Sequence, residues 1–401
     1  MTLSVRGILV GVAAAGTLTS TIFCGLALTA AWRFRQSKRR ASAQGTEFTP
    51  PVSVLKPLHG TEPGLQRNLE SFFQQGYPAP YEILFCARHA DDEGLVLARR
   101  VAARYPSQPV RFLTCGEPPW PNPKMFSLSV LKQAARYPVL VTSDADCRVA
   151  PDYLLQCVQS LASAHASAGK PVELAFCLYR GHVDTGSLFT HLDAVGKSVE
   201  MASGVLIANM LSGTDFALGV TMVLRGTAFD DAGGCEDLAH YWAEDFQLGN
   251  RLAKAGRGVE ISPHVMEMNL ADHGARRSFR DQLRWMQSTR RSRPWGHLGT
   301  GLTFAMPFGL LGFAACGASG SWLAACTFLG LAVANRLLQA FVLLRTLEER
   351  RMFFYTAIYP LRDLLGFAVW CCSYLPADTR YHGTAFRIMP DGRLLPMPKA
   401  N

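Results

Sequence analysis

VLVTSDAD, at residues 139–146, is the stretch that decides the fold. Its first four residues suit a buried strand, and the strand ends at once in two carboxylates, Asp144 and Asp146. Ligands of an open α/β sheet bind at the carboxyl ends of its strands. The stretch therefore predicts a strand, and also the edge of the sheet at which a site would lie.

Strand and helix patterns alternate in the residues that lead up to this stretch. The alternation predicts a parallel sheet wound through right-handed crossovers. After it the pattern is less regular. The expected strands are residues 52–55, 81–86, 110–113, 139–142, 172–178 and 219–224, and the expected helices are residues 65–73, 95–105, 124–137 and 188–205.

The apolar residues gather toward the two ends of the 401-residue chain. Residues 8–32 carry no charge, and residues 299–341 carry only Arg336. The first run is long enough to cross a bilayer, and the second divides near residues 317–321 into two spans. A cleaved signal peptide is the alternative for the first run, but five basic residues at 33–40 favour an uncleaved anchor with the following domain in the cytoplasm.

Charge and cysteine content exclude other classes. The net charge of +9 lies largely beside the apolar segments, where it meets anionic lipid headgroups, and no nucleic-acid-binding motif accompanies it. We therefore expect no nucleic-acid partner. The eleven cysteines have no CxxC spacing, which favours core-filling thiols in a reducing compartment.

Asp144 and Asp146 are candidate metal ligands. Carboxylates at a strand end can share one ligand, and their hard oxygens suit a Mg²⁺ or Mn²⁺ that also holds phosphate. The alternative is a polar turn that merely ends the strand.

Glu244 and Asp245 form a second acidic pair, between Gly233-Gly234 and a helix that ends at Gly256. Two acids at a helix start can simply favour the positive end of its dipole. The functional interpretation is that Asp245 is a general base that takes a proton from a hydroxyl.

Arg284 and Trp285 lie in a segment, residues 276–293, that contains seven arginines. Arginine can pair with a diphosphate through two parallel hydrogen bonds, and tryptophan can cover a sugar or acceptor face. A basic, aromatic helix at a membrane surface is the alternative, and it needs no catalytic role.

The ordered blocks together resemble the ceramide glucosyltransferase family. They are VSVLKPLHG at 52–60, NLESFF at 68–73, Tyr77-Pro78, Asp91-Asp92, Asn122-Pro123-Lys124, Asp144, Gly219, Arg225, AGG at 232–234, AED at 243–245 and Arg284-Trp285. The resemblance implies an inverting, metal-dependent transferase with a GT-A type doubly wound mixed α/β sheet.

The resemblance also implies roles for single residues. Asp92 would contact the uracil or ribose of the donor, and Lys124 the nucleotide. Asp144 would hold the metal diphosphate, with Asp146 beside it. Asp245 would meet the acceptor hydroxyl, and Arg284 with Trp285 the diphosphate and the acceptor entrance.

One position departs from the family pattern, because Asp281 stands where Gln or Arg is usual, three residues before the Arg-Trp pair. This departure and the run at residues 293–299 also resemble the hopanoid-pathway glycosyltransferases of bacteria, which are thought to pass N-acetylglucosamine to a polycyclic lipid alcohol. The chain has 32 arginines and 8 lysines, which hints at a GC-rich bacterial genome.

We therefore expect three regions: an N-terminal transmembrane anchor with its basic flank (1–40), a cytoplasmic GT-A domain (41–295), and a C-terminal membrane region and tail (296–401). In the last region we expect two spans and one interfacial or re-entrant helix at 353–375, where Arg362 and Asp363 would be paired or functional. The location would be multi-pass in a cell membrane, the bacterial inner membrane.

The expected reaction moves one hexose from a UDP-sugar donor to the hydroxyl of a lipid in the bilayer. A processive polysaccharide synthase would share the acidic and Arg-Trp motifs, but more spans would then be expected. A non-catalytic membrane adaptor of the same fold is the remaining alternative.

Overall fold

The computed structural model describes residues 5–44, 48–162, 170–272, 274–375, 378–381 and 384–397. The chain forms two compact units, each built from separate stretches of sequence. We call them the helical unit (Met1–Gln36, Thr185–Met210 and Asp272–Ala377) and the sheet unit (Ser37–Asp184, Leu211–Ala271 and Asp378–Asn401). Residues 185–210 thus belong to the helical unit, although they lie inside the sequence range 41–295.

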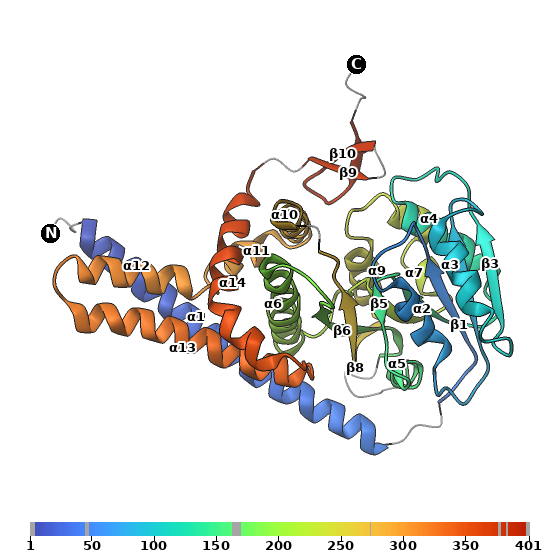
Figure 1. Ribbon diagram of the computed structural model, residues 1–401, viewed down its shortest axis with the longest axis horizontal. Coiled ribbons are helices and arrows are strands. Elements are labelled where there is room, and N and C mark those ends of the chain that lie inside the picture. Colours follow the sequence, from blue (N-terminus) through green and yellow to red (C-terminus); the bar gives the residue numbers. More distant parts are fainter. Residues whose placement is uncertain are drawn as a thin grey trace. The chain divides into compact units, whose positions relative to one another are not determined.

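The sheet unit is built on one eight-stranded mixed sheet of order β3-β2-β1-β4-β7-β6-β8-β5 (Figure 1). Its strands are β1 (Val52–Pro57), β2 (Tyr81–Ala87), β3 (Val110–Thr114), β4 (Val139–Ser143), β5 (Cys147–Arg148), β6 (Val172–His182), β7 (Thr221–Arg225) and β8 (Gly258–Asn269). The first four pair in parallel, β7 is antiparallel to β4 and β6, and β5 is antiparallel to β8.

The helices of the sheet unit lie between its strands in the sequence, and three of them connect parallel strands. They are α2 (Leu65–Phe73), α3 (Glu93–Ala102), α4 (Pro123–Ala134), α5 (Tyr153–Ser160), α7 (Ala228–Asp231), α8 (Gly234–Leu238) and α9 (Glu244–Lys254). The chain moves outward from β1 to β3 and then returns past β1 to β4. Since such crossovers are right-handed, α2 and α3 cover one face and α4 the other. The doubly wound mixed sheet expected from the sequence is confirmed.

Apolar strands form the centre of the sheet. Val54 of β1 lies opposite Ile83 of β2 and Val141 of β4, and all three side chains are fully buried. A strand buried on both faces reads as a continuous apolar run, which is why these strands were visible in the sequence. Their common register brings the ends of β1 and β4 together, at Lys56 and Ser143.

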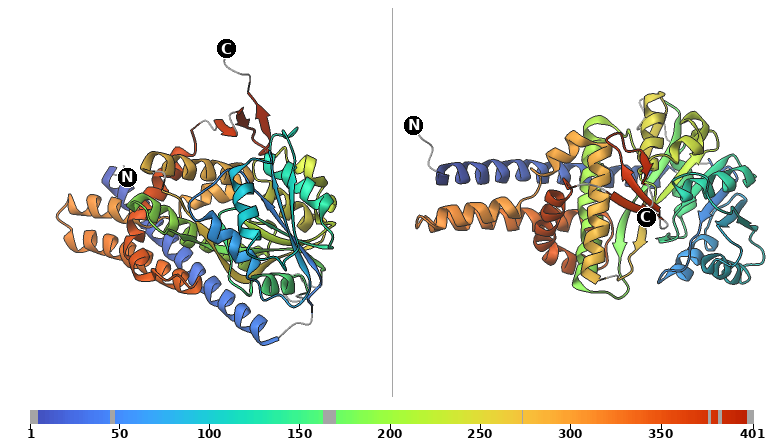
Figure 2. Two further views of the ribbon diagram at one scale, coloured as in Figure 1. Left: turned by 45° about the vertical axis from the view of Figure 1, so that its right-hand side comes forward. Right: turned by 90° about the horizontal axis from the view of Figure 1, so that it is seen from above.

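The helical unit contains most of α1 (Val5–Gln44) and of α6 (Leu188–Ser212), together with α10 (Gly274–Ser292), α11 (Pro294–Thr300), α12 (Met306–Gly317), α13 (Trp322–Thr346) and α14 (Met352–Cys372). Two described helices are long and apolar enough to cross a membrane, Val5–Ala41 and Trp322–Thr346. In both views of Figure 2, α1 lies alongside α12 and α13. The Asn335 side chain of α13 donates to Thr21 of α1 (3.3 Å), which fixes the two helices side by side.

Charged groups inside the helical unit are paired. Arg336 of α13 and Asp363 of α14 are each 2% exposed and form an ion pair of 3.0 Å. Arg362 binds both carboxylate oxygens of Glu200 on α6, at 2.8 and 2.7 Å. The prediction that Arg362 and Asp363 are paired is confirmed, and the structure adds their partners.

The C-terminal part of the sheet unit forms a second, three-stranded sheet, which the sequence pattern did not predict. Its order is β11-β10-β9, with β9 (Asp378–Tyr381), β10 (Thr384–Ile388) and β11 (Leu394–Pro396). Phe386, Ile388 and Leu394 are buried, so β10 and β11 are packed against protein rather than exposed on both faces.

Candidate active site

A buried lysine forms hydrogen bonds to the chain at the end of β4, next to Asp144. Lys56, at the end of β1, is fully buried, and its Nζ donates to the Asp144 carbonyl (2.6 Å) and the Ser143 hydroxyl (3.2 Å). Its ammonium also lies 4.0 Å from the centre of the Phe72 ring. Burial lowers the pKa of Lys56 to about 8, against the opposing charges of Cys147, Asp144 and Asp146. Lys56 thus fixes the backbone after β4 and leaves the Asp144 carboxylate to other partners.

The partner of that carboxylate is Lys124, in the first turn of α4. Asn122 begins this helix by accepting from the Met125 N–H, and Pro123 occupies its first position, a favourable place for proline. The Lys124 Nζ lies 2.7 Å from Asp144 Oδ1. Burial by itself lowers the pKa of Lys124, but the carboxylates around it outweigh burial and raise it. Lys124 is therefore a firmly charged cation at the strand ends.

Lys124 also joins the second acidic motif to the first. Its Nζ lies 3.5 Å from Glu244 Oε1 and donates to the Gly219 carbonyl at 3.1 Å. Glu244 accepts a further hydrogen bond from the Asn122 amide (3.1 Å). Burial raises the pKa of Glu244 to about 7, and the Lys124 charge opposes that rise. The two acidic motifs, about 100 residues apart in sequence, thus form one cluster.

Asp245 is held by backbone N–H groups in the first turn of α9. Its Oδ2 accepts from Gly219 (2.6 Å) and its Oδ1 from Phe246 (2.8 Å). Burial raises the pKa of Asp245, while Lys124 and these hydrogen bonds act in the opposite direction. A carboxylate that is oriented by backbone N–H groups and made more basic by burial suits a general base.

Gly219 is required at its place because Asp245 approaches it closely. A Cβ on Gly219 would lie 2.9 Å from the Asp245 Cβ and 2.9 Å from its Oδ2. We expect Gly219→Ala to displace the carboxylate and to lower kcat roughly tenfold or more, because small misplacements of reacting groups are costly. Steady-state rates of sugar transfer measure this. Gly204→Ala is the matched control, since a Cβ there meets no described atom within 4 Å, and an equal loss in both variants would contradict the argument.

Asp92 anchors a neighbouring loop. As the N-cap of α3 it accepts from the N–H groups of Gly94 (2.9 Å) and Leu95 (3.3 Å). Its Oδ2 accepts from the N–H of Gly60, in the loop after β1 (3.0 Å). Asp92 therefore caps α3 and holds the loop after β1 against the start of this helix. The nucleoside contact expected of Asp92 stays a prediction.

Arg284 and Trp285 lie on α10, which belongs to the helical unit, whereas the acidic cluster belongs to the sheet unit. Trp285 is 36% exposed, and the Lys197 ammonium of α6 lies 5.3 Å from the centre of its ring. At the departing position, Asp281 lies 3.9 Å from Arg277 in a partly exposed pair. Its neighbour Gln282 is buried and accepts from Arg362. Gln282, rather than Asp281, thus makes the buried hydrogen bond with Arg362.

The donor set suits a hard cation. Asp144 directly follows β4 and Asp146 directly precedes β5, two residues apart. In the described part of the chain, no group of three His, Cys, Asp or Glu side chains could hold a metal. Mg²⁺ commonly takes one or two carboxylates and completes its shell with water and substrate phosphates. Two carboxylates are the donor type that such a cation takes, and the role of Asp144 and Asp146 as metal ligands stays a prediction.

The mixed sheet and the acidic cluster at its strand ends agree with the α/β glycosyltransferase expected from the sequence. A family model described as Glycosyl transferase family 21 matches residues 12–394, so the chain belongs to that family. The resemblance to the ceramide glucosyltransferases is thereby confirmed.

Curated relatives agree with this assignment. Ceramide glucosyltransferase 1 of Caenorhabditis elegans is 29% identical over 238 residues, 59% of this chain and 49% of the relative. Ceramide glucosyltransferase 3 of the same organism is 27% identical over 241 residues, 59% of this chain and 50% of the relative. The chain thus spans about half the length of these relatives.

Solved structures are more distant. A Pyrobaculum calidifontis mannosyltransferase in complex with GDP-Man and Mn²⁺ matches with a TM-score of 0.46 and 16% identity, covering 91% of this chain and 99% of that one. GalNAc-T7 with UDP, GalNAc and Mn²⁺ matches with a TM-score of 0.41 and 12% identity, covering 62% and 52% of the two chains.

Four residues of the cluster received no individual role from sequence: Lys56, Asn122, Gly219 and Glu244. Each had a visible signal, and Gly219 begins the expected strand at 219–224. Lys56 directly follows a buried strand, and Asn122 precedes a proline at a helix start, which is a capping signal. Glu244 adjoins the expected base. The signals give positions in the sequence, but only the fold shows that Lys124 links Glu244 to Asp144.

Proposed function

We propose that this protein is a membrane-bound inverting glycosyltransferase that moves one hexose from a UDP-sugar to a membrane lipid hydroxyl. The observation that carries the proposal is the Lys124 ammonium held between Asp144 and Glu244, beside the oriented carboxylate of Asp245. A fixed cation next to a fixed base suits the departure of an anionic leaving group as a hydroxyl attacks.

The reaction is a single displacement. Asp245 takes the proton of the acceptor hydroxyl, whose oxygen forms a bond to the anomeric carbon. The bond from that carbon to the diphosphate oxygen breaks on the opposite face, so the configuration inverts. Lys124 attracts the departing diphosphate. Asp144 and Asp146 would hold Mg²⁺ or Mn²⁺, which supplies charge neutralisation when bound.

The remaining predicted residues complete the proposed donor and acceptor sites. Asp92 would lie near the uracil or ribose. Arg284 would pair with the diphosphate, and Trp285 would border the acceptor entrance. Arginine carries a forked set of donors that matches phosphate oxygens, which supports this assignment.

The acceptor is proposed to be a lipid because two described helices can cross a membrane. Basic residues at 33–40 and 290–293 favour a cytoplasmic location for the catalytic region, in a multi-pass protein of the bacterial inner membrane. Within this proposal, residues 1–40 form the anchor, 41–295 the catalytic domain and 296–401 the membrane region. The bilayer would then present the acceptor hydroxyl to the enzyme.

A ceramide acceptor with UDP-glucose is the first candidate, because the curated relatives are named ceramide glucosyltransferases. A hopanoid alcohol with UDP-N-acetylglucosamine is the second. It is favoured by Asp281 and the run at 293–299, which resemble the hopanoid branch.

Purified protein in lipid nanodiscs distinguishes these candidates. Each UDP-sugar is offered with each lipid, with Mg²⁺ or Mn²⁺ present, and the lipids are analysed by mass spectrometry. We expect one sugar per lipid with one donor and acceptor pair, and none after the metal is chelated. A ladder of products with many sugars would instead identify a processive polysaccharide synthase.

A further inference from the structure

The C-terminal strands β10 and β11 are joined by a tight turn, Met389-Pro390-Asp391-Gly392, whose residues suit its shape. The Gly392 N–H donates to the Met389 carbonyl (2.9 Å), and the Arg393 N–H donates to the Asp391 carboxylate (3.1 Å). Gly392 has a φ of 84°, which glycine adopts without strain. Proline and aspartate favour the central positions of such a turn. The turn is therefore locally rigid.

The residues that follow this turn pair with the segment before the proposed base. Tyr241 and Arg393 form an antiparallel bridge. The Trp242 N–H donates to the Gly392 carbonyl (3.0 Å), and the Leu394 N–H donates to the His240 carbonyl (2.8 Å). The backbone of residues 240–242 is thus held by the C-terminal hairpin (residues 384–397).

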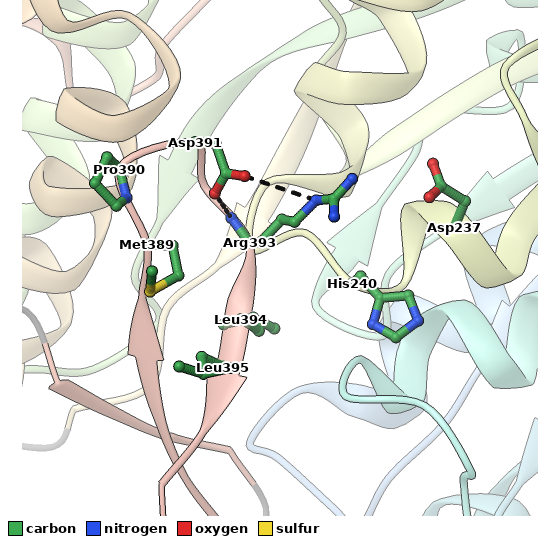
Figure 3. A pocket seen from close by; sticks show the side chains of 8 residues that line it. All are labelled: Asp237, His240, Met389, Pro390, Asp391, Arg393, Leu394 and Leu395. Atoms are coloured by element: carbon green, nitrogen blue, oxygen red, sulfur yellow. Dashed lines mark hydrogen bonds and ion pairs between the residues drawn. The ribbon is translucent and has the colours of Figure 1, made fainter.

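Side chains reinforce this pairing around Tyr241, which is only 9% exposed. The Arg393 Nε donates to the Tyr241 hydroxyl at 3.1 Å. The guanidinium carbons of Arg393 and Arg251 lie 5.3 and 5.1 Å from the centre of its ring, within range of cation–π attraction. Figure 3 shows Arg393 extending from the hairpin toward Asp237, the residue that forms an ion pair with Arg251.

This contact lies three residues before the catalytic motif. Helix α9 begins at Glu244, and its N-cap residue is Ala243, which has no side-chain oxygen to cap the helix. Contacts from other segments hold the start of α9 instead. Arg393 donates to Tyr241, just before the helix, and the Gly219 N–H donates to Asp245, within its first turn. The segment that leads into α9 is thus in contact with a hairpin about 150 residues later in the chain.

We propose that the C-terminal hairpin positions the catalytic base, with Arg393 as the positioning residue that acts through Tyr241 on Asp245. The expected fall in kcat rests on the proposed function, whereas the expected loosening of the backbone before Asp245 does not. The hairpin has an independent attachment through buried Phe386, Ile388 and Leu394. Loss of the Arg393 side chain is therefore expected to loosen residues 240–246 while the hairpin stays folded.

The test compares full-length Arg393→Ala with Arg387→Ala, an exposed arginine of β10 that pairs within the hairpin with Leu395. Hydrogen–deuterium exchange is expected to rise at the amides of 242–246 in Arg393→Ala and not in Arg387→Ala. The kcat of Arg393→Ala is expected to fall roughly 10–100-fold, the scale of a small misplacement of a reacting group, with the KM for the UDP-sugar little changed. Arg393→Lys, which keeps a cation near the ring, should recover part of the rate.

Tyr241→Phe completes a double-mutant cycle, because it removes the hydroxyl that accepts from Arg393 and keeps the ring. Combined with Arg393→Ala it should add little further loss. Unchanged exchange at 242–246 would overturn the inference whatever the activity. Faster exchange with a wild-type kcat would overturn the positioning role, and so would an equal loss in Arg387→Ala. Absence of sugar transfer in the wild type would instead reject the proposed function, and the exchange data would still test the contact.

Discussion

Asp245→Asn is expected to lower kcat by roughly 10²–10⁴-fold, the contribution of a positioned general base. Asparagine keeps the size of the side chain and one oxygen for a backbone N–H, but it cannot take a proton from the acceptor hydroxyl. The KM for the UDP-sugar should change little, because the proposed role of Asp245 is toward the acceptor. Initial rates of sugar transfer to lipid at saturating donor measure both quantities.

Asp152→Asn is a matched control, since this aspartate also lies in the sheet unit but is 55% exposed. It should keep wild-type activity. Unfolding curves for both variants show whether the fold is intact. An Asp245→Asn protein that transfers sugar or complements cells as well as the wild type would refute the enzymatic proposal, and a non-catalytic membrane adaptor would then explain the fold better.

The strands at the centre of the sheet could be predicted because they are apolar throughout. The long strand β8 was missed, although its burial alternates along residues 258–269 as in a half-buried strand. It contains Pro263, and proline inside a run argues against a central strand. The register between β6 and β8 shifts between Ser262 and Val265, so an irregularity accommodates the proline. A strand can thus contain a proline where its pairing register shifts.

For the candidate site, too, the sequence predicted the positions of the acidic residues but not the contacts between them. The acids at 144–146 and 244–245 could be found from sequence because each lies at the end or the start of an expected element. Their connection through Lys124 depends on how β4, α4 and α9 pack, and no local pattern encodes it. The pairing of Arg393 with Tyr241 is harder still, since the two residues are separated by 152 positions.

In the helical unit, the pairing of charged groups could be predicted from the sequence, but the partners could not. Ionisable groups within apolar helices are expected to be paired, which correctly anticipated Arg362 and Asp363. Their partners are Glu200, 162 positions away, and Arg336, 27 positions away. The need for a partner follows from the cost of a buried charge, whereas its identity follows from the packing of α6, α13 and α14.

The second large effect concerns stability. Asp363→Ala is expected to destabilise the protein by ~3–5 kcal/mol, because it leaves the buried Arg336 guanidinium without its carboxylate. The same carboxylate accepts from the N–H groups of Ala305 (2.9 Å) and Met306 (2.8 Å) at the start of α12, and these donors also lose their partner. Unfolding in detergent can be followed with a thiol-reactive dye, since Cys24 and Cys316 are only 4% and 5% exposed.

Three further variants separate the contributions of charge and hydrogen bonding. Asp363→Asn keeps an acceptor for the α12 N–H groups and loses the charge, so its loss should be smaller than that of Asp363→Ala. Replacing both Arg336 and Asp363 by leucine removes the unpaired charge and should recover much of the stability, because apolar substitutes for a buried ion pair are often tolerated. Asp281→Ala, at a partly exposed pair in the same unit, should change stability by less than ~1 kcal/mol. If the double variant were less stable than Asp363→Ala, the ion pair would not be the source of the loss.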